Sequence, residues 1–103
     1  KDKKIGFLIG GIGITPVISM LEYTADKNIT PDVCLFYSNR QEEEIAFKEE
    51  LNMWQSKNAR IKVFYAVTDC EPSDKNCIFG RIDKKIIMEK DKDFSNRTVF
   101  IFG

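Results

Sequence analysis

The stretch FLIGGIGITPVISML, residues 7–21, decides the fold of this chain. Its apolar letters are interrupted by Gly10, Gly11, Gly13, Thr15 and Pro16. Glycine lets the main chain turn tightly and lets another molecule approach it closely. The threonine suits a helix N-cap and the proline suits the first helical position. The stretch therefore predicts a strand, a glycine turn and a helix whose N-terminus is a natural seat for a phosphate group.

Length and charge narrow the function classes. The chain has 103 residues, which is enough for one domain with a single core. Lysine plus arginine and aspartate plus glutamate each number 16, so the net charge is zero. This argues against nucleic acid as the main partner, because binding a phosphate backbone needs a basic surplus. We also expect no membrane span, which needs about 20 apolar residues, and no signal peptide.

The cysteines indicate a reducing compartment. Cys34 lies in an apolar run and is expected in the core. Cys70 and Cys77 lie in a polar loop, where a disulfide or a shared metal are both alternatives. Because there is no histidine and no CxxC pair, we expect no metal site. A cytoplasmic location fits this composition best.

Apolar runs and turn signals give the order of the elements. Strands are predicted at residues 5–9, 33–38, 61–68 and 99–102, and helices at 15–27, at 41–57 and within 80–90. Continuous apolar runs are typical of parallel strands that are buried on both faces. Right-handed crossovers then place helices on both faces of the sheet. We predict an α/β fold with a doubly wound parallel sheet in three layers, α/β/α.

The predicted helix at 41–57 has its own local signals. Ser38 or Asn39 is expected to cap it, and three glutamates at 42–44 would lie in its first turn. Its inner stripe would be Phe47, Leu51 and Trp54.

The glycine turn is more specific than a general phosphate motif. It departs from the Rossmann fingerprint, since Pro16 takes the place of the third glycine, and it lacks the Lys-Ser/Thr end of a P-loop. A tight turn without a ligand remains the structural alternative. The letters GGIGITP, however, resemble the nucleotide-binding domain of the ferredoxin–NADP reductase superfamily, whose first strand typically ends in G-G-x-G-(I/V)-(T/A)-P. The later stretches LFYSNR, VFYAVT, FGRID and VFIFG resemble further elements of that domain, so the similarity covers almost the whole chain.

The resemblance implies a function and a set of site residues. In that superfamily the glycine turn receives a dinucleotide pyrophosphate, and the nicotinamide meets an FAD or FMN on a preceding barrel domain. Electrons then pass to a further acceptor, which the motifs do not name. Carried over by position, the cofactor-binding residues are Gly10, Gly11, Gly13, Ile14, Thr15, Pro16, Ser38, Asn39, Arg40, Thr68, Asp69, Arg81 and Gly103. Thr15 would only position the nicotinamide.

The resemblance also bears on domain organisation. Residues 1–103 would form one NAD(P)-binding domain with strand order 3-2-1-4, a fifth strand beyond the sequence and a flavin-binding domain upstream. Many members end their fourth strand in Cys-Gly, whereas this chain reads Phe102-Gly103, so no cysteine role is carried over.

Charged residues at the strand ends bear on the choice of cofactor. Arg40 can meet a phosphate or stack on adenine, or it can pair with Glu43 or Glu44. NADP-using members often carry Ser-Arg where this chain has Asp69. A carboxylate there would accept from ribose hydroxyls and repel a 2′-phosphate, while Arg81 would oppose that repulsion. NADH is therefore favoured over NADPH.

Two other classes are weighed against this interpretation. One is another α/β domain that uses the same turn for a mononucleotide or FMN. The other is a flavodoxin-fold signalling module, which would carry acidic residues after its first strand, where this chain has glycines.

Overall fold

A parallel sheet forms the centre of the molecule. A computed structural model describes residues 4–29, 31–69 and 71–102. The strands are β1 Lys4–Gly10, β2 Asp32–Asn39, β3 Ile61–Val67, β4 Ile78–Phe79 and β5 Thr98–Phe102. The helices are α1 Thr15–Asp26, α2 Lys48–Lys57 and α3 Lys84–Lys90, with short 3-10 turns η1 Gly11–Ile14, η2 Glu42–Glu44 and η3 Phe94–Asn96.

The strand order is β4-β3-β2-β1-β5, with every pairing parallel. The α/β class is confirmed, and the predicted order 3-2-1-4 corresponds to β3-β2-β1-β5. The prediction differs in one strand, because β4 adds to the outer edge of β3 through only Ala66 and Val67. A strand of two residues carries too short an apolar pattern to be recognised in the sequence.

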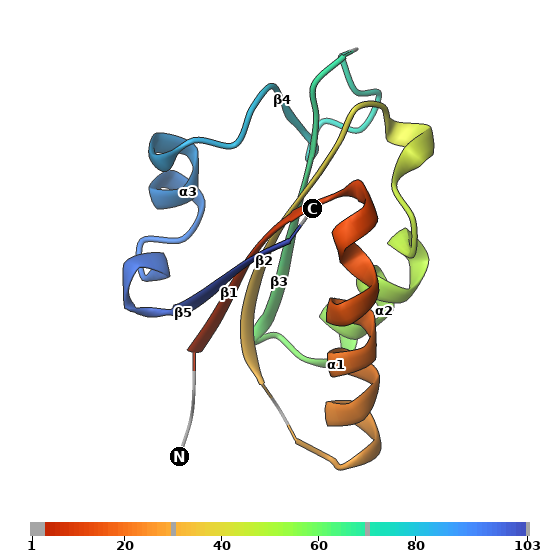
Figure 1. Cartoon of the computed structure of the whole chain (residues 1–103), viewed down its shortest axis with the longest axis vertical. Helices are drawn as coiled ribbons and strands as arrows, with labels where there is room; N and C mark the ends of the chain where they lie inside the picture. Colours follow the sequence, from red (N-terminus) through yellow and green to blue (C-terminus); the bar gives the residue numbers. More distant parts are fainter. Residues whose placement is uncertain (1–3, 30, 70, 103) are drawn as a thin grey trace.

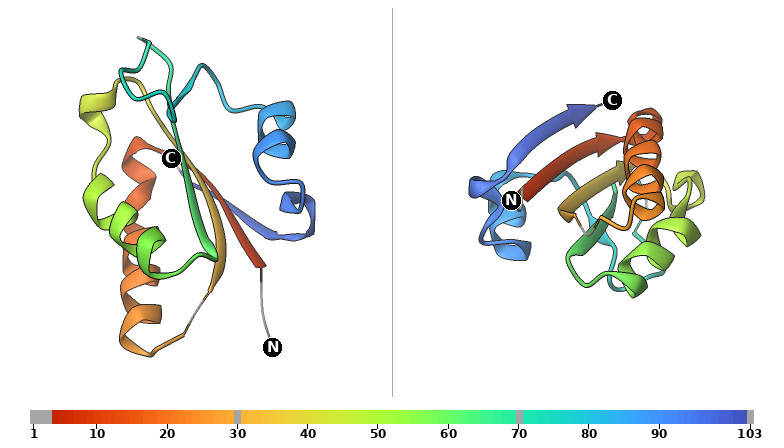
Figure 2. Two further views of the ribbon diagram at one scale, coloured as in Figure 1. Left: turned by 180° about the vertical axis from the view of Figure 1, so that it is seen from behind. Right: turned by 90° about the horizontal axis from the view of Figure 1, so that it is seen from below.

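Helices cover both faces of the sheet, as predicted. Helices α1 and α2 lie on one face, and α3 lies on the other (Figure 1, Figure 2). This arrangement follows from the right-handed crossovers that join parallel neighbours.

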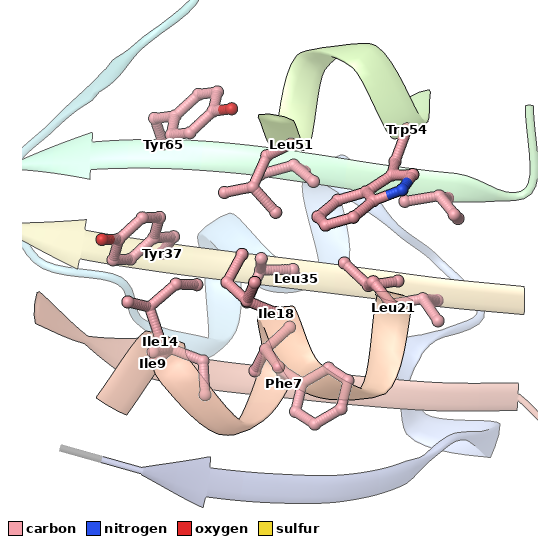
Figure 3. Close-up of a cluster of buried hydrophobic side chains, with 14 of the residues drawn as sticks. Phe7, Ile9, Ile14, Ile18, Leu21, Leu35, Tyr37, Leu51, Trp54 and Tyr65 are labelled. Atoms are coloured by element: carbon pink, nitrogen blue, oxygen red, sulfur yellow. The ribbon is translucent and has the colours of Figure 1, made fainter. Parts of the chain in front are cut away.

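The main core lies between the sheet and the pair α1 and α2 (Figure 3). Alternate residues of β2, Val33, Leu35 and Tyr37, are fully buried on this face. Leu21 of α1 and Leu51 of α2 pack against them. Burial of such side chains is the main source of stability in a domain of this size.

A smaller aromatic core lies on the face covered by α3. The ring of Phe36 stacks on that of Phe64, with 5.1 Å between the ring centroids, and lies edge-on to that of Phe94, with 5.6 Å between the centroids. Cys34 is buried in the same cluster as a free thiol, as expected, and burial raises its pKa to about 12. Cys77 is likewise free and buried, while Cys70 lies outside the described residues.

The predicted continuous helix at 41–57 is wrong. The chain forms η2, then leaves the helical path, and α2 begins only after Phe47, whose φ is +62°. The hydroxyl of Tyr37 accepts a hydrogen bond from the Ala46 backbone N–H at 3.1 Å, which holds the break against the sheet. Phe47 is 40% exposed and outside the inner stripe, whereas Leu51 and Trp54 are buried as predicted.

The predicted caps of that helix are also wrong. Gln41 precedes η2 and Phe47 precedes α2, so Ser38 and Asn39 remain within β2. Glu42 turns away from the helix instead. Its carboxylate accepts from the backbone N–H of Ser73 at 2.8 Å, a hydrogen bond that lowers the pKa of Glu42. This contact fixes the loop between β3 and β4.

Only part of the outer edge of β3 has a strand neighbour. Within the described residues, β4 pairs with the last two residues of β3, and no strand lies beside the rest of β3. The Gln55 side chain of α2 occupies one of the open positions, where its Oε1 accepts from the Val63 N–H at 2.9 Å. A hollow of about 690 Å³ runs along this edge between α2 and α3.

A buried ionic cluster ties the chain together at the amino ends of the strands. The guanidinium of Arg97 donates from Nε to Asp91 Oδ2 at 2.7 Å and from Nη1 to Asp32 Oδ1 at 2.9 Å. It also donates to the Asp32 and Ile5 carbonyls. Burial acts to raise the pKa of Asp91, but the hydrogen bonds from Arg97, the Asp93 backbone and Cys34, together with the charge of Arg97, outweigh it and hold this pKa below its usual range.

The described residues lack two kinds of feature. No helix there is long and apolar enough to cross a membrane. No group of three or more Cys, Asp or Glu side chains in the same part of the chain is placed to hold a metal ion.

Candidate dinucleotide site

The glycine turn lies at the carboxyl end of β1, in the middle of the sheet. Gly10 pairs with Ser38 of β2, and the chain then tightens into η1 and runs directly into α1. The prediction that Thr15 caps the helix is wrong. Ile14 takes the cap position, and Thr15 already has helical angles, φ −57° and ψ −45°. The reason is the 3-10 turn, which makes the chain helical one residue earlier than the sequence suggests.

The N-terminus of α1 is accessible from outside. Thr15 and Pro16 are exposed, and no side chain among the described residues caps the helix. The preceding Gly13 and Ile14 are buried, so Ile14 can reach a ligand only through its backbone. Ile12 points outward from the turn and is 91% exposed. Because no side chain caps this helical stretch, the main-chain N–H groups at its start and the positive end of its dipole are suited to a phosphate.

A pocket at the carboxyl edge joins three of the predicted residues. Gly10, Ser38 and Arg81 line a space of about 340 Å³, together with apolar side chains that include Ile101 and Phe102. This volume is within the range of small-molecule sites. The residue before Arg81 is Gly80, whose φ of +113° is a left-handed conformation that favours glycine.

A second group of predicted residues lies at the ends of β2 and β3. The guanidinium Nε of Arg40 lies 3.2 Å from Asp69 Oδ2, and the Asp69 N–H donates to the Arg40 carbonyl at 2.9 Å. Thr68 donates to the other carboxylate oxygen at 3.3 Å. The expected alternative, Arg40 with Glu43 or Glu44, is not observed. Both side chains of the pair are exposed to solvent, Arg40 by 75% and Asp69 by 39%.

Asn39 lies beneath the glycine turn. Its side chain follows the buried row of β2 and is 7% exposed. A Cβ at Gly11 would lie 2.7 Å from Asn39 Oδ1, well inside contact distance. The amide Nδ2 is buried and has no partner among the described residues. Buried amide groups are nearly always hydrogen-bonded, so this one requires an explanation.

The arrangement fits a dinucleotide. An open helix terminus faces the glycine turn, a carboxylate and an arginine stand at the neighbouring strand ends, and a buried amide lacks a partner. Ligand sites of parallel sheets lie beyond the carboxyl ends of the strands, where all these residues gather. Of the predicted site residues, Gly103 lies outside the described residues.

Sequence comparison gives a family and several relatives. The model of the family described as the oxidoreductase NAD-binding domain matches residues 7–103. NADH nitrate reductase 1 of Nicotiana tabacum is 33% identical over 99 residues, which cover 94% of this chain and 11% of that protein. The NAD(P)H nitrate reductase of Betula pendula is 30% identical over 88 residues, which cover 84% of this chain and 10% of that protein. The chain thus spans about a tenth of the length of these relatives.

Solved structures share the fold. The cytochrome b5 reductase domain of Ulva prolifera nitrate reductase superposes with a TM-score of 0.76 at 25% identity, covering 86% of this chain and 34% of that one. The CS-b5R domains of human Ncb5or, in the NAD+ form, superpose with a TM-score of 0.77 at 23% identity. This match covers 99% of this chain and 30% of that one. With a family match over nearly its whole length, and with the resemblance to the ferredoxin–NADP reductase superfamily confirmed, the chain belongs to the oxidoreductase NAD-binding domain family.

Proposed function

We propose that this domain binds NADH or NADPH and presents the nicotinamide to a flavin carried by another domain of the same protein. The observation that carries the proposal is the uncapped N-terminus of α1, which opens directly behind the glycine turn at the carboxyl edge of the sheet. That terminus would receive the pyrophosphate.

The residues of this chain would bind and orient the cofactor. The main chain at Gly10, Gly11 and Gly13 would border the pyrophosphate, while the exposed Thr15 and Pro16 would face the nicotinamide. The bound cofactors supply the chemistry, a hydride passing from the nicotinamide to the flavin. This transfer requires no acid, base or nucleophile from the protein. Thr15 would therefore act by position alone.

NADH is the favoured cofactor. Asp69 stands at the end of β3, where its carboxylate would accept from the hydroxyls of the adenosine ribose. A 2′-phosphate would meet a like charge there, at a cost of about 1–4 kcal/mol for charges a few ångströms apart at a surface site. Arg40 offsets part of this charge through its contact at 3.2 Å. Among the relatives, the tobacco enzyme is named for NADH and the birch enzyme for NAD(P)H.

Further domains complete the proposal. The relatives are about ten times longer than this chain, which leaves room for an FAD- or FMN-binding domain and for a domain that hands electrons to a further acceptor. The exposed apolar side chains Ile12 and Ile101, 91% and 74% accessible, suit contact with such a domain. The free thiols of Cys34 and Cys77 suit the reducing cytoplasm.

Rapid mixing tests the function. The full-length protein is mixed with NADH without oxygen, and the visible absorbance of its flavin is followed. We expect the absorbance to bleach, more slowly when the transferred hydrogen of NADH is deuterium, because hydride transfer breaks that bond. A full-length protein that binds neither NADH nor NADPH, or that holds no flavin, would contradict the proposal.

A further inference from the structure

Asn39 breaks the pattern of the strand to which it belongs. The residues of β2 that face α1 and α2 are Val33, Leu35 and Tyr37, each fully buried in the main core. Asn39 is the next residue of this row and is 93% buried, yet it brings a polar amide. Its Nδ2 has no partner among the described residues. An unpaired buried donor destabilises the fold, so an apolar side chain would serve the core better.

The amide oxygen of Asn39 explains why position 11 is occupied by a glycine. A Cβ at Gly11 would lie 2.7 Å from Asn39 Oδ1 and 3.8 Å from its Cγ, and among the described residues outside its own turn it would meet no other atom within 4 Å. The amide therefore fills the space that a side chain at position 11 would occupy. A side chain at position 11 would have to displace the Asn39 amide, whether or not a ligand is bound.

We propose that Asn39 is a positioning residue of the dinucleotide site. Its amide fixes the distance between β2 and the turn at Gly11. The position of this turn then fixes the position of the N–H groups at the start of α1. This role rests on the proposed function. It explains why a costly polar group is retained at the end of an apolar row, because stability is given up for a fixed turn.

A double-mutant cycle tests the pairing in the full-length protein. Gly11→Ala alone displaces the amide and the turn, and we expect KM for NADH to rise about tenfold. In an Asn39→Ala background the added methyl group has room, so the same change should raise KM less than about threefold. In both backgrounds kcat should stay nearly constant, since neither residue touches the nicotinamide. An equal rise in KM in both backgrounds would overturn the proposal and show that Gly11 is needed for the ligand alone.

A second variant separates positioning from stability. Asn39→Leu keeps the branching at Cγ but replaces the amide oxygen and nitrogen with two bulkier methyl groups, so it removes the unpaired donor and presses on the turn at Gly11. We expect its unfolding midpoint to equal or exceed that of the unmodified protein, while its KM for NADH rises about tenfold. A merely structural residue would change the midpoint and leave KM alone, so an unchanged KM would overturn the proposal even if Gly11→Ala does not fold.

Two controls keep the outcomes apart. Gly6→Ala makes the same substitution in β1, where the new Cβ would meet Phe94 at 2.7 Å instead. It should lower the unfolding midpoint without changing KM. If the unmodified protein neither binds nor oxidises NADH or NADPH, the proposed function itself fails. If it does so and the cycle is additive, only the role of Asn39 fails.

Discussion

The two ends of the sheet carry the same pair of residue types in opposite surroundings. At the amino ends, the side chains of Arg97 and Asp91 are 3% and 4% exposed and 2.7 Å apart. At the carboxyl ends, Arg40 and Asp69 are 75% and 39% exposed and 3.2 Å apart. The buried pair cannot separate without leaving a charge in the core, whereas water can replace either partner of the exposed pair. The amino end therefore holds the fold, and the carboxyl end keeps its charges available for a ligand.

Replacing each of the two arginines should give the largest difference in stability between the two ends of the sheet. Arg97→Met leaves Asp91 and Asp32 without their shared partner, and we expect a loss of about 3–5 kcal/mol in the free energy of unfolding. Arg40→Met, the matched control, should cost less than about 1 kcal/mol. Urea unfolding followed by the fluorescence of Trp54 measures both. Equal losses would show that burial does not separate the two pairs.

A methyl group added at Gly6 tests the packing of the amino end, beside the Arg97 side chain, whose Cδ it would approach to 3.4 Å. The new Cβ would lie 2.7 and 2.8 Å from two ring carbons of Phe94, which is buried against Phe36. Forcing this ring aside should destabilise the domain by about 1–3 kcal/mol. The dissociation constant for NADH, measured by calorimetry on the folded variant, should stay the same. A weakened affinity would mean that the two ends are coupled.

Reversing the charge at the carboxyl end should change selectivity and not stability. Asp69→Arg removes the carboxylate, frees Arg40 and adds a second cation for a 2′-phosphate. We expect the ratio of kcat/KM for NADPH to that for NADH to rise about tenfold or more. The unfolding midpoint should hardly move. The assignment of NADH fails if the unmodified enzyme already has the higher kcat/KM with NADPH.

The smallest effect is expected from pH. Because the pKa of Asp91 is lower in the folded than in the unfolded state, its contribution to stability is complete above the unfolded value of about 3.9. The contribution is lost as the pH falls through the folded pKa. The difference in unfolding free energy between the unmodified protein and Asp91→Asn should therefore stay constant from pH 7 to about pH 4 and shrink as the pH falls further toward 3. A difference that stays constant down to pH 3 would contradict the assignment.

Much of the fold could be predicted because its signals are local. Continuous apolar runs mark β1, β2, β3 and β5, and the glycine turn marks where β1 ends. The failures come from side-chain contacts that join one element to the next or to a distant loop. The break before α2 depends on the Tyr37 hydroxyl, nine residues from its partner Ala46, and the loop before β4 depends on Glu42.

The candidate site could be located but not assembled from the sequence. Strand ends identify Ser38, Asn39, Arg40, Thr68 and Asp69 as residues at the ligand edge. The sequence could not show that Arg40 meets Asp69, 29 positions away, in place of a neighbouring glutamate. It also gave no measure of the distance from Asn39 to the glycine turn. One signal was present, since an asparagine ends an alternating row of buried apolar residues.

The Gln55 side chain has a consequence for how molecules of this protein meet each other. An open parallel edge such as that of β3 can accept a strand from a second chain, and such additions lead to aggregation. The glutamine carboxamide accepts a hydrogen bond from the Val63 N–H at 2.9 Å, as the backbone carbonyl of a neighbouring strand would. An incoming chain must first expel this side chain from α2 before its own backbone can pair there. One amide thus occupies a backbone donor that an added strand would need, although no strand of the described residues covers that position.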